Sequence, residues 1–190
     1  MVEKALGDVA GEVTQLLAAA RSGQTSAWGQ IYRLLYRDLR NQARAQLGRS
    51  AQQTLSPTAL INEAWIRLSG IDVGAENRRQ LIALCITAMR SVIVDQTRRK
   101  LREKRGGGMQ VLSLSDGWDS GEDSGLEQLV ELDAALAKLS KKMPHLATVV
   151  EWRYFGGLSE EEISRLLDVN VRKVRRDWLT ARAFLLRALG

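Results

Sequence analysis

The sequence predicts an all-α protein that consists of two helical domains joined by a flexible linker. Apolar residues recur every three or four positions over most of the chain, which is the spacing of one face of a helix. Ala, Leu and Arg are abundant, whereas proline occurs only twice in the 190 residues and aromatic residues make up 5%. The hydrophobic content of 45% is sufficient for real cores, and a chain of this length can hold one large or two small domains.

An N-terminal domain of four helices is expected over residues 1–105. Its clearest boundary is Ser56-Pro57, because serine at the N-cap followed by proline at the first helical position is a strong start signal. The last helix is nearly all apolar over residues 81–94 and strongly basic afterwards, so its end either lies along nucleic-acid backbone or is simply solvated. The four helices are expected at about residues 12–20, 26–47, 57–70 and 77–104.

An acidic linker rich in glycine and serine is expected over residues 106–125. Three consecutive glycines end the helical pattern at residues 106–108, and residues 113–125 carry four acidic residues and no basic one. Such a composition is typical of a flexible connector. The alternative is a long surface loop within one domain, but loops above about 12–15 residues are uncommon in compact domains. Trp118 is unusual for a spacer and indicates that the linker docks somewhere.

A C-terminal domain is expected over residues 126–190, and its last part has a helix-turn-helix pattern. Ser159, with Glu162 three residues later, forms a capping box that begins one helix. A tight turn at residues 168–170 follows, and Asn170 is placed to cap the next helix. That helix has its buried stripe at Val171, Val174, Trp178, Ala181 and Leu185, and two earlier helices are expected at about residues 126–139 and 144–155.

The cations of the last helix predict DNA binding. Arg172, Lys173, Arg175 and Arg176 fall largely on the side opposite the apolar stripe. In a helix that enters the major groove, arginine can bond guanine edges bidentately and lysine can hold phosphate. The net charge of +6 also favours a polyanionic partner. The alternative is an ordinary solvated face of a helical bundle.

Several other classes of protein are disfavoured by the sequence. Cys85 is the only cysteine, which excludes an internal disulfide and fits a reducing compartment. No apolar run approaches the roughly 20 residues of a membrane span, and no signal peptide is evident, so a soluble cytoplasmic protein is expected. His145 is the only histidine, and neither a phosphate loop, a metal-ligand cluster nor a nucleophile with a nearby base occurs. We therefore expect no catalytic residues, no metal and no cofactor.

Two motifs resemble the bacterial sigma factors of the extracytoplasmic-function (ECF) type. Residues 89–99, MRSVIVDQTRR, look like the region 2 helix that meets the −10 promoter element. The C-terminal pattern looks like sigma region 4, and the whole resemblance covers about residues 10–189. The residues that carry the region 4 resemblance are 136–139, 157–163, 169–175 and 181–185.

The resemblance implies a transcription initiation factor that performs no chemistry itself. Region 2 would bind the β′ clamp helices of core RNA polymerase and melt the −10 element, and region 4 would bind the β flap and read the −35 element. The linker would follow the RNA-exit path. The implied −35 contacts are Arg172, Lys173, Arg175 and Arg176; the −10 contacts are Arg90, Ser91, Asp95, Arg98 and Arg99; the polymerase contacts are Thr58, Leu60, Asn62, Glu63 and Trp65.

The sequence departs from the ECF pattern at three places. Leu84 stands where a tryptophan is usual and Ser91 where an asparagine is usual, which makes the −10 contacts less secure than the −35 contacts. Most relatives also open the third helix with carboxylates that pair with arginines of the polymerase clamp. Residues 55–62 contain no carboxylate, and Glu63 is the first acid.

A phosphate on the third helix could compensate for this missing charge. Residues 55–65 and 176–178 look like a subgroup that is linked to serine/threonine kinases rather than to a membrane anti-sigma factor. Thr58 lies in the first helical turn, where free amides and the helix dipole favour an anion, and a phosphate on Thr58 or Ser56 adds about −1.5 to −2 charges. The alternative is that Ser56 is only an N-cap and Thr58 a solvated residue. Ser50, Thr54 and control by an anti-sigma factor also stay open.

Three rival functions remain at this point. A conventional helix-turn-helix repressor or activator would bind duplex DNA without polymerase, but it has no need of the basic extension after residue 95. An enzyme acting on nucleic acid is poorly supported by the residues. An interaction protein such as an anti-activator is the third.

Overall fold

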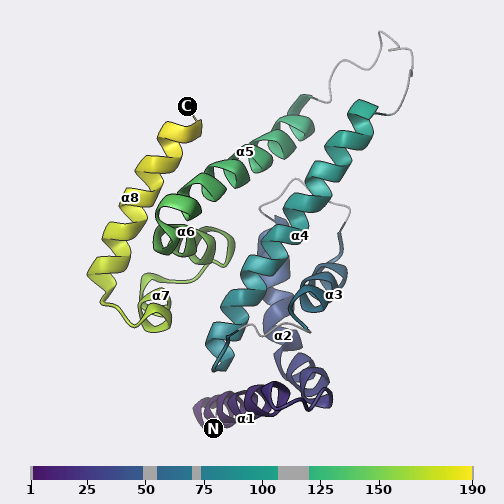
Figure 1. The fold of residues 1–190 in the computed structure, drawn as a ribbon, viewed down its shortest axis with the longest axis vertical. Coiled ribbons are helices and arrows are strands. Elements are labelled where there is room, and N and C mark those ends of the chain that lie inside the picture. Colours follow the sequence, from purple (N-terminus) through teal and green to yellow (C-terminus); the bar gives the residue numbers. More distant parts are fainter. Residues whose placement is uncertain (1, 49–54, 70–73, 107–119, 190) are drawn as a thin grey trace.

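The computed structural model describes residues 2–48, 55–69, 74–106 and 120–189, and within these ranges the chain is helical and contains no strand (Figure 1). The all-α fold class is thereby confirmed. The helices are α1 (Val2–Arg21), α2 (Ser26–Gly48), α3 (Pro57–Leu68), α4 (Arg78–Gly106), α5 (Ser120–Lys142), α6 (Pro144–Val150), the π-helix η1 (Glu151–Phe155), α7 (Glu160–Leu167) and α8 (Val171–Leu189).

Helices α1 to α4 form an N-terminal unit around one apolar core. Ile31, Leu35 and Leu39 are fully buried and lie four residues apart, so they form a single stripe along α2. Helices α1, α3 and α4 cover this stripe. Burial of one such side chain stabilises the fold by about 1.5–3 kcal/mol relative to an exposed position. The other large, fully buried side chains of this core are Leu17, Leu60, Ile61, Leu81 and Met89.

Helices α5 to α8 form a C-terminal unit with its own core. Leu136 and Leu139 of α5 pack with Leu146 of α6 and with Ala181 and Leu185 of α8. A smaller cluster attaches α7 to this core through Ile163, which contacts Val149 and Val174. The unit therefore places α7 and α8 as a pair on a support made by α5 and α6.

The long helices α4 and α5 run side by side, and α4 takes part in both units (Figure 1). Ile86, in the first third of α4, is fully buried in the cluster that Leu136, Phe155 and Leu185 make in the C-terminal unit. Gly156 lies directly against it, since a Cβ at Gly156 would come within 2.9 Å of the Ile86 Cδ1 atom. The two units are thus in apolar contact through α4.

Most expected helix boundaries are confirmed, with three differences. Helix α1 begins at Val2, well before the expected residue 12. Residues 120–125, expected in the linker, form the start of α5. The expected helix over residues 144–155 is α-helical only to Val150, and its last five residues form a π-helix. Residues 107–119, which include Trp118, lie outside the described residues.

Candidate nucleic-acid and polymerase interfaces

The helix-turn-helix has the capping geometry that its sequence predicts. The Ser159 hydroxyl accepts from the Glu162 amide at 3.1 Å, and the Glu162 carboxylate accepts from the Ser159 amide at 2.8 Å. Asp168 turns the chain with a left-handed conformation, φ 52°, and the Asn170 side chain then accepts from the Lys173 amide at 2.8 Å. Both helix starts are therefore fixed by local hydrogen bonds.

The four predicted −35 cations of α8 fall into two pairs with different surroundings. Arg172 and Arg176 are exposed and lie one helical turn apart. Lys173 donates to the Asp177 carboxylate at 2.5 Å, and Arg175 contacts Glu160 of α7 at 2.9 Å. Arg172 and Arg176 are consequently the two whose guanidiniums are best placed to meet an external acceptor.

Glu160 joins the elements of the helix-turn-helix to one another. Its carboxylate accepts hydrogen bonds from Arg153 of η1 and from Arg175 of α8. These two bonds, that of Arg153 first, lower the pKa of Glu160 below its ordinary value of 4.5. The Arg153 guanidinium also lies over the Trp178 ring, 4.8 Å from its centroid. One carboxylate thus fixes the angle of α7 against α8.

The expected −10 residues of α4 lie on more than one face of that helix. Ser91 and Asp95 face α3, where Arg67 donates to the Ser91 hydroxyl at 3.1 Å and to the Asp95 carboxylate at 2.8 Å. Arg99 is exposed and pairs with Glu103 one turn along the same helix. The sequence did not single out Arg67, which organises this polar group.

Arg90 and Arg98 face the C-terminal unit instead. The Arg90 guanidinium bonds Asp133 of α5 and also Glu151 of η1, the latter at 2.7 Å. Arg98 reaches the same Asp133 carboxylate at 2.8 Å. In this arrangement the Arg90 side chain is only 13% exposed, so it has no access to an external partner.

The start of α3 carries the expected polymerase and phosphorylation residues. The Ser56 hydroxyl accepts from the Ala59 amide at 3.1 Å and caps the helix, as predicted. Thr58 is exposed, with its hydroxyl 3.1 Å from that of Tyr36, and Asn62 is exposed and accepts from Tyr32 at 2.5 Å. Trp65 is half-buried against Trp28 and Tyr32, with ring centroids 5.7 and 5.2 Å away.

The solvent exposure of two residues of α3 differs from what the resemblance to sigma factors implies about contacts with polymerase. Leu60 is fully buried in the N-terminal core, so in this conformation it positions α3 and presents no surface to a partner. Ile66, which the sequence did not single out, is 67% exposed. Helical spacing places Ile66 on the same exposed face as Asn62 and Glu63. The signal that could have found it is an isoleucine among polar residues of an amphipathic helix.

Comparison with known proteins identifies the family. A family model described as "ECF sigma factor" matches residues 10–190, which is nearly the whole chain. The chain belongs to the ECF sigma factor family. It is accordingly a transcription initiation factor, whose partners are core RNA polymerase and promoter DNA. A comparison with curated proteins gives no significant match.

Among the described residues of this ECF sigma factor, neither the pattern of a metal site nor that of a membrane-spanning helix occurs. No group of three or more His, Cys, Asp or Glu side chains there is arranged to hold a metal ion. None of the helices in the described ranges is both long and apolar enough to cross a membrane. Cys85 is buried, and burial raises the pKa of its thiol to about 12, so it remains a protonated core residue.

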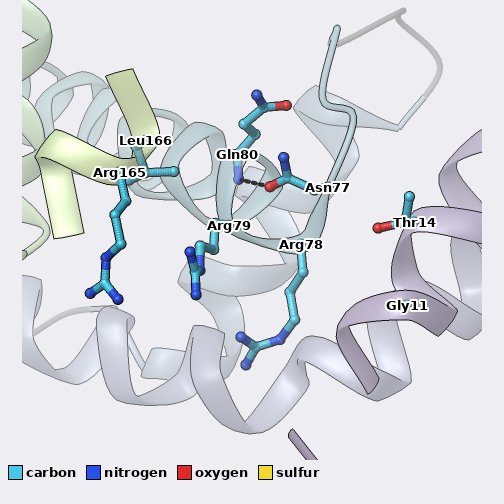
Figure 2. A pocket seen from close by; sticks show the side chains of 8 residues that line it. All are labelled: Gly11, Thr14, Asn77, Arg78, Arg79, Gln80, Arg165 and Leu166. Carbon is cyan, nitrogen blue, oxygen red and sulfur yellow. Dashed lines mark hydrogen bonds between the residues drawn. The ribbon is translucent and has the colours of Figure 1, made fainter. Parts of the chain in front are cut away.

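A hollow of about 380 Å³ in this sigma factor separates α1, the start of α4 and α7 (Figure 2). Asn77 caps α4 by accepting from the Gln80 amide at 3.1 Å, and Arg78 pairs with Asp38 of α2. Arg79 of α4 and Arg165 of α7 line the same hollow. Arginines of both units therefore line this hollow.

Proposed function

We propose that this ECF sigma factor reads the −35 element with α8, engages the −10 element with α4, and docks on the polymerase clamp through α3. The observation that carries the proposal is the capped helix-turn-helix, with Arg172 and Arg176 exposed and, among the described residues, unpaired at the start of its second helix, in a chain that matches the family along its length. The linker between the units and the end of α4 would then follow the path of the nucleic acid.

The −35 contacts are ranked by the surroundings of the four cations. Arg172 and Arg176 supply the direct contacts, because both are exposed and one turn apart. Arg175 is 63% exposed and can exchange Glu160 for phosphate, whereas Lys173 is held by the mostly buried Asp177. A bidentate arginine–guanine contact contributes about 1–3 kcal/mol of discrimination, so Arg172→Ala should relax sequence preference more than Lys173→Ala does.

The −10 contacts would come from Ser91 and Asp95, which face α3, and from Arg90, Arg98 and Arg99, which lie on other sides of α4. Arg67 fixes the Asp95 carboxylate at 2.8 Å, which orients a polar acceptor beside the cationic end of α4. A base contact at Ser91 together with phosphate contacts at the arginines would follow the usual division between specific and positioning contacts.

Polymerase binding would use the exposed face of α3. Thr58, Asn62, Glu63 and Ile66 are exposed there, and Trp65 supports the helix from behind. An apolar residue among polar neighbours is the composition expected at the centre of a protein interface. Leu60 contributes indirectly, because its burial fixes the orientation of that face.

Phosphorylation of Thr58 would activate this surface, and the factor would belong to the kinase-linked subgroup. Thr58 is exposed in the first turn of α3, whose first turn contains no acidic residue. The only described carboxylate on α3, that of Glu63, already lies 3.8 Å from Arg67. A phosphate near the helix N-terminus is stabilised by the dipole and adds the negative charge that clamp arginines attract. Ser56 is the less suitable acceptor, because its hydroxyl caps the helix.

The test is a pull-down of bacterial core RNA polymerase with the wild-type chain and with Thr58→Glu, Thr58→Gln and Thr58→Ala. Binding by any form supports the sigma function. Stronger binding by the Glu variant than by the near-isosteric Gln variant supports the phosphate switch, because the two differ chiefly in charge. Equal binding by all four would make Thr58 structural and leave control to another device, such as an anti-sigma factor. Failure of all four to bind core, with tight binding to duplex DNA alone, would favour a conventional repressor.

A further inference from the structure

A partly buried cluster of charges joins the two units of the sigma factor. We call it the Arg90 cluster. Arg90 directs one arm of its guanidinium to Asp133 and the other to Glu151, and Thr87 donates to the second Glu151 oxygen at 2.8 Å. Arg98 closes the cluster from the solvent side by donating to the second Asp133 oxygen. Every carboxylate oxygen of Asp133 and Glu151 therefore has a donor that comes from α4.

The inner part of the cluster is largely shielded from solvent, so its ion pairs are screened less than exposed pairs are. The Arg90, Asp133 and Glu151 side chains are 13%, 16% and 15% exposed, whereas Arg98 is 46% exposed. Phe155 lies beneath Arg90, with the guanidinium carbon 5.5 Å from the ring centroid. A buried charge that loses its partner is strongly unfavourable, so Arg90 retains both carboxylates for as long as the units stay together.

The π-helix η1 carries the two C-terminal groups of this contact, Glu151 and Phe155. Its widened turn, in which the Gly156 amide bonds the Glu151 carbonyl at 3.0 Å, places Glu151 and Phe155 together against α4. Single turns of π-helix occur often at functional positions. Here the turn serves the contact between the units.

We propose that the Arg90 cluster holds the free sigma factor in a closed form that masks Arg90 and one side of Arg98, two of the proposed −10 contacts on α4, while leaving the −35 face of α8 open. Asp133 and Glu151 take the positions at Arg90 and Arg98 that DNA phosphates would take in a promoter complex. The inference rests on the proposed −10 contacts of α4. Arg172 and Arg176 remain exposed in the same conformation, so α8 is not covered.

Opening of the closed form separates the Arg90 cluster and also the apolar contact that Ile86 makes with the C-terminal core. The outer arm of the cluster at Arg98 is accessible to water, so opening can begin there. When the units separate, the carboxylates of Asp133 and Glu151 are hydrated again. Arg90 can then pair with a phosphate group of DNA. Binding of DNA then shifts a population between two arrangements, and the apparent affinity of the free chain is reduced by the fraction that is open.

The first experiment measures closure directly. Fluorescent dyes are placed on the full-length chain at Gln15→Cys of α1 and Arg187→Cys of α8, which are exposed, while native Cys85 is 1% exposed and stays unlabelled. Asp133→Asn combined with Glu151→Gln should lower the energy transfer by separating the units. Arg98→Gln, which removes only the exposed arm, should lower it less. The matched control is Glu131→Gln with Glu12→Gln, two exposed residues whose replacement makes the same change in net charge.

The second experiment measures masking, with mixed-sequence single-stranded and duplex DNA as probes. In the Asp133/Glu151 double variant the affinity for single-stranded DNA should rise about tenfold over the control, as expected when an open fraction near one tenth becomes dominant. Affinity for duplex DNA should rise no more than in the control, because α8 is open in both forms. Circular dichroism verifies that the variant retains its helices.

The outcomes of these experiments test the closed form independently of the proposed sigma function. Unchanged energy transfer in a folded double variant overturns the closed form. Lower energy transfer without a gain for single-stranded DNA overturns the masking. If core RNA polymerase binds none of these proteins, the proposed function fails, whereas the energy transfer still reports whether the Arg90 cluster holds the units together.

Discussion

Replacement of Glu160 by glutamine tests the ion pairs that hold the helix-turn-helix. Gln keeps the size of the side chain but removes the charge that Arg153 and Arg175 share. An exposed ion pair contributes about 0.2–1 kcal/mol. The Arg175 pair belongs to the lower part of this range because Arg175 is 63% exposed, and the Arg153 pair to the upper part because Arg153 is 32% exposed and lies over Trp178. The expected loss is about 1 kcal/mol of local stability in α7 and α8.

Hydrogen exchange of the α7 and α8 amides measures this loss within the intact chain. A loss of about 1 kcal/mol corresponds to roughly fivefold faster exchange at neutral pH, after correction for intrinsic rates. Glu131→Gln, an exposed change on α5, is the control and should alter stability by less than about 0.5 kcal/mol.

The pH dependence of the effect gives the stricter test. The folded-state pKa of Glu160 is lowered from its ordinary value of 4.5, so its carboxylate contributes fully above that value. The contribution is lost as the pH falls through the lowered folded-state pKa. The wild type and Glu160→Gln should therefore differ at neutral pH and converge in strong acid. A difference of the same size at both pH values, or none at neutral pH, would refute the assignment of the stabilisation to this charge.

Three further substitutions test other parts of the fold by thermal or chemical unfolding. Ser159→Ala removes the hydroxyl that accepts from Glu162 and should cost about 1 kcal/mol, with Ser159→Asp retaining most stability because aspartate also caps. Gly157→Ala forces a side chain onto a backbone with φ 65° and should cost about 1 kcal/mol; an unchanged melting temperature would mean that the turn relaxes freely. Leu39→Ala leaves a cavity in the N-terminal core and should cost about 2–5 kcal/mol, and a loss below 1 kcal/mol would show that neighbouring helices collapse into the space.

Local patterns predicted the helices well where the start signal and the apolar spacing agree. Ser56-Pro57 predicted the start of α3, and the residues Ser159, Glu162 and Asn170 predicted both caps of the helix-turn-helix. A helix cap can be predicted from a few neighbouring residues, because the capping side chain accepts from amides that lie two or three positions ahead. The same patterns did not predict that α5 begins at Ser120, because the glycines and serines of residues 120–125 have low helix propensity.

Candidate contact residues were predicted by type, but their surroundings were not. An arginine in a basic helix gives no sign that its partners lie 43 and 61 positions away, as those of Arg90 do. The Lys173–Asp177 pair was within reach of the sequence, because four positions is the spacing of neighbours on a helix face. Leu60 and Ile66 show the same limit, since an apolar residue can face either a core or a partner.

The sequence by itself determined the all-α class, the order of the helices, the capped helix-turn-helix and the ECF family. Each of these depends on periodicity, on caps, or on motifs that are short in sequence. Only the tertiary structure decided that α4 joins both cores through Ile86, and that Glu160 ties η1 to α8. It also decided that Arg90 is occupied by Asp133 and Glu151. The reason is that a charged side chain can reach several partners, and the packing of distant helices selects among them.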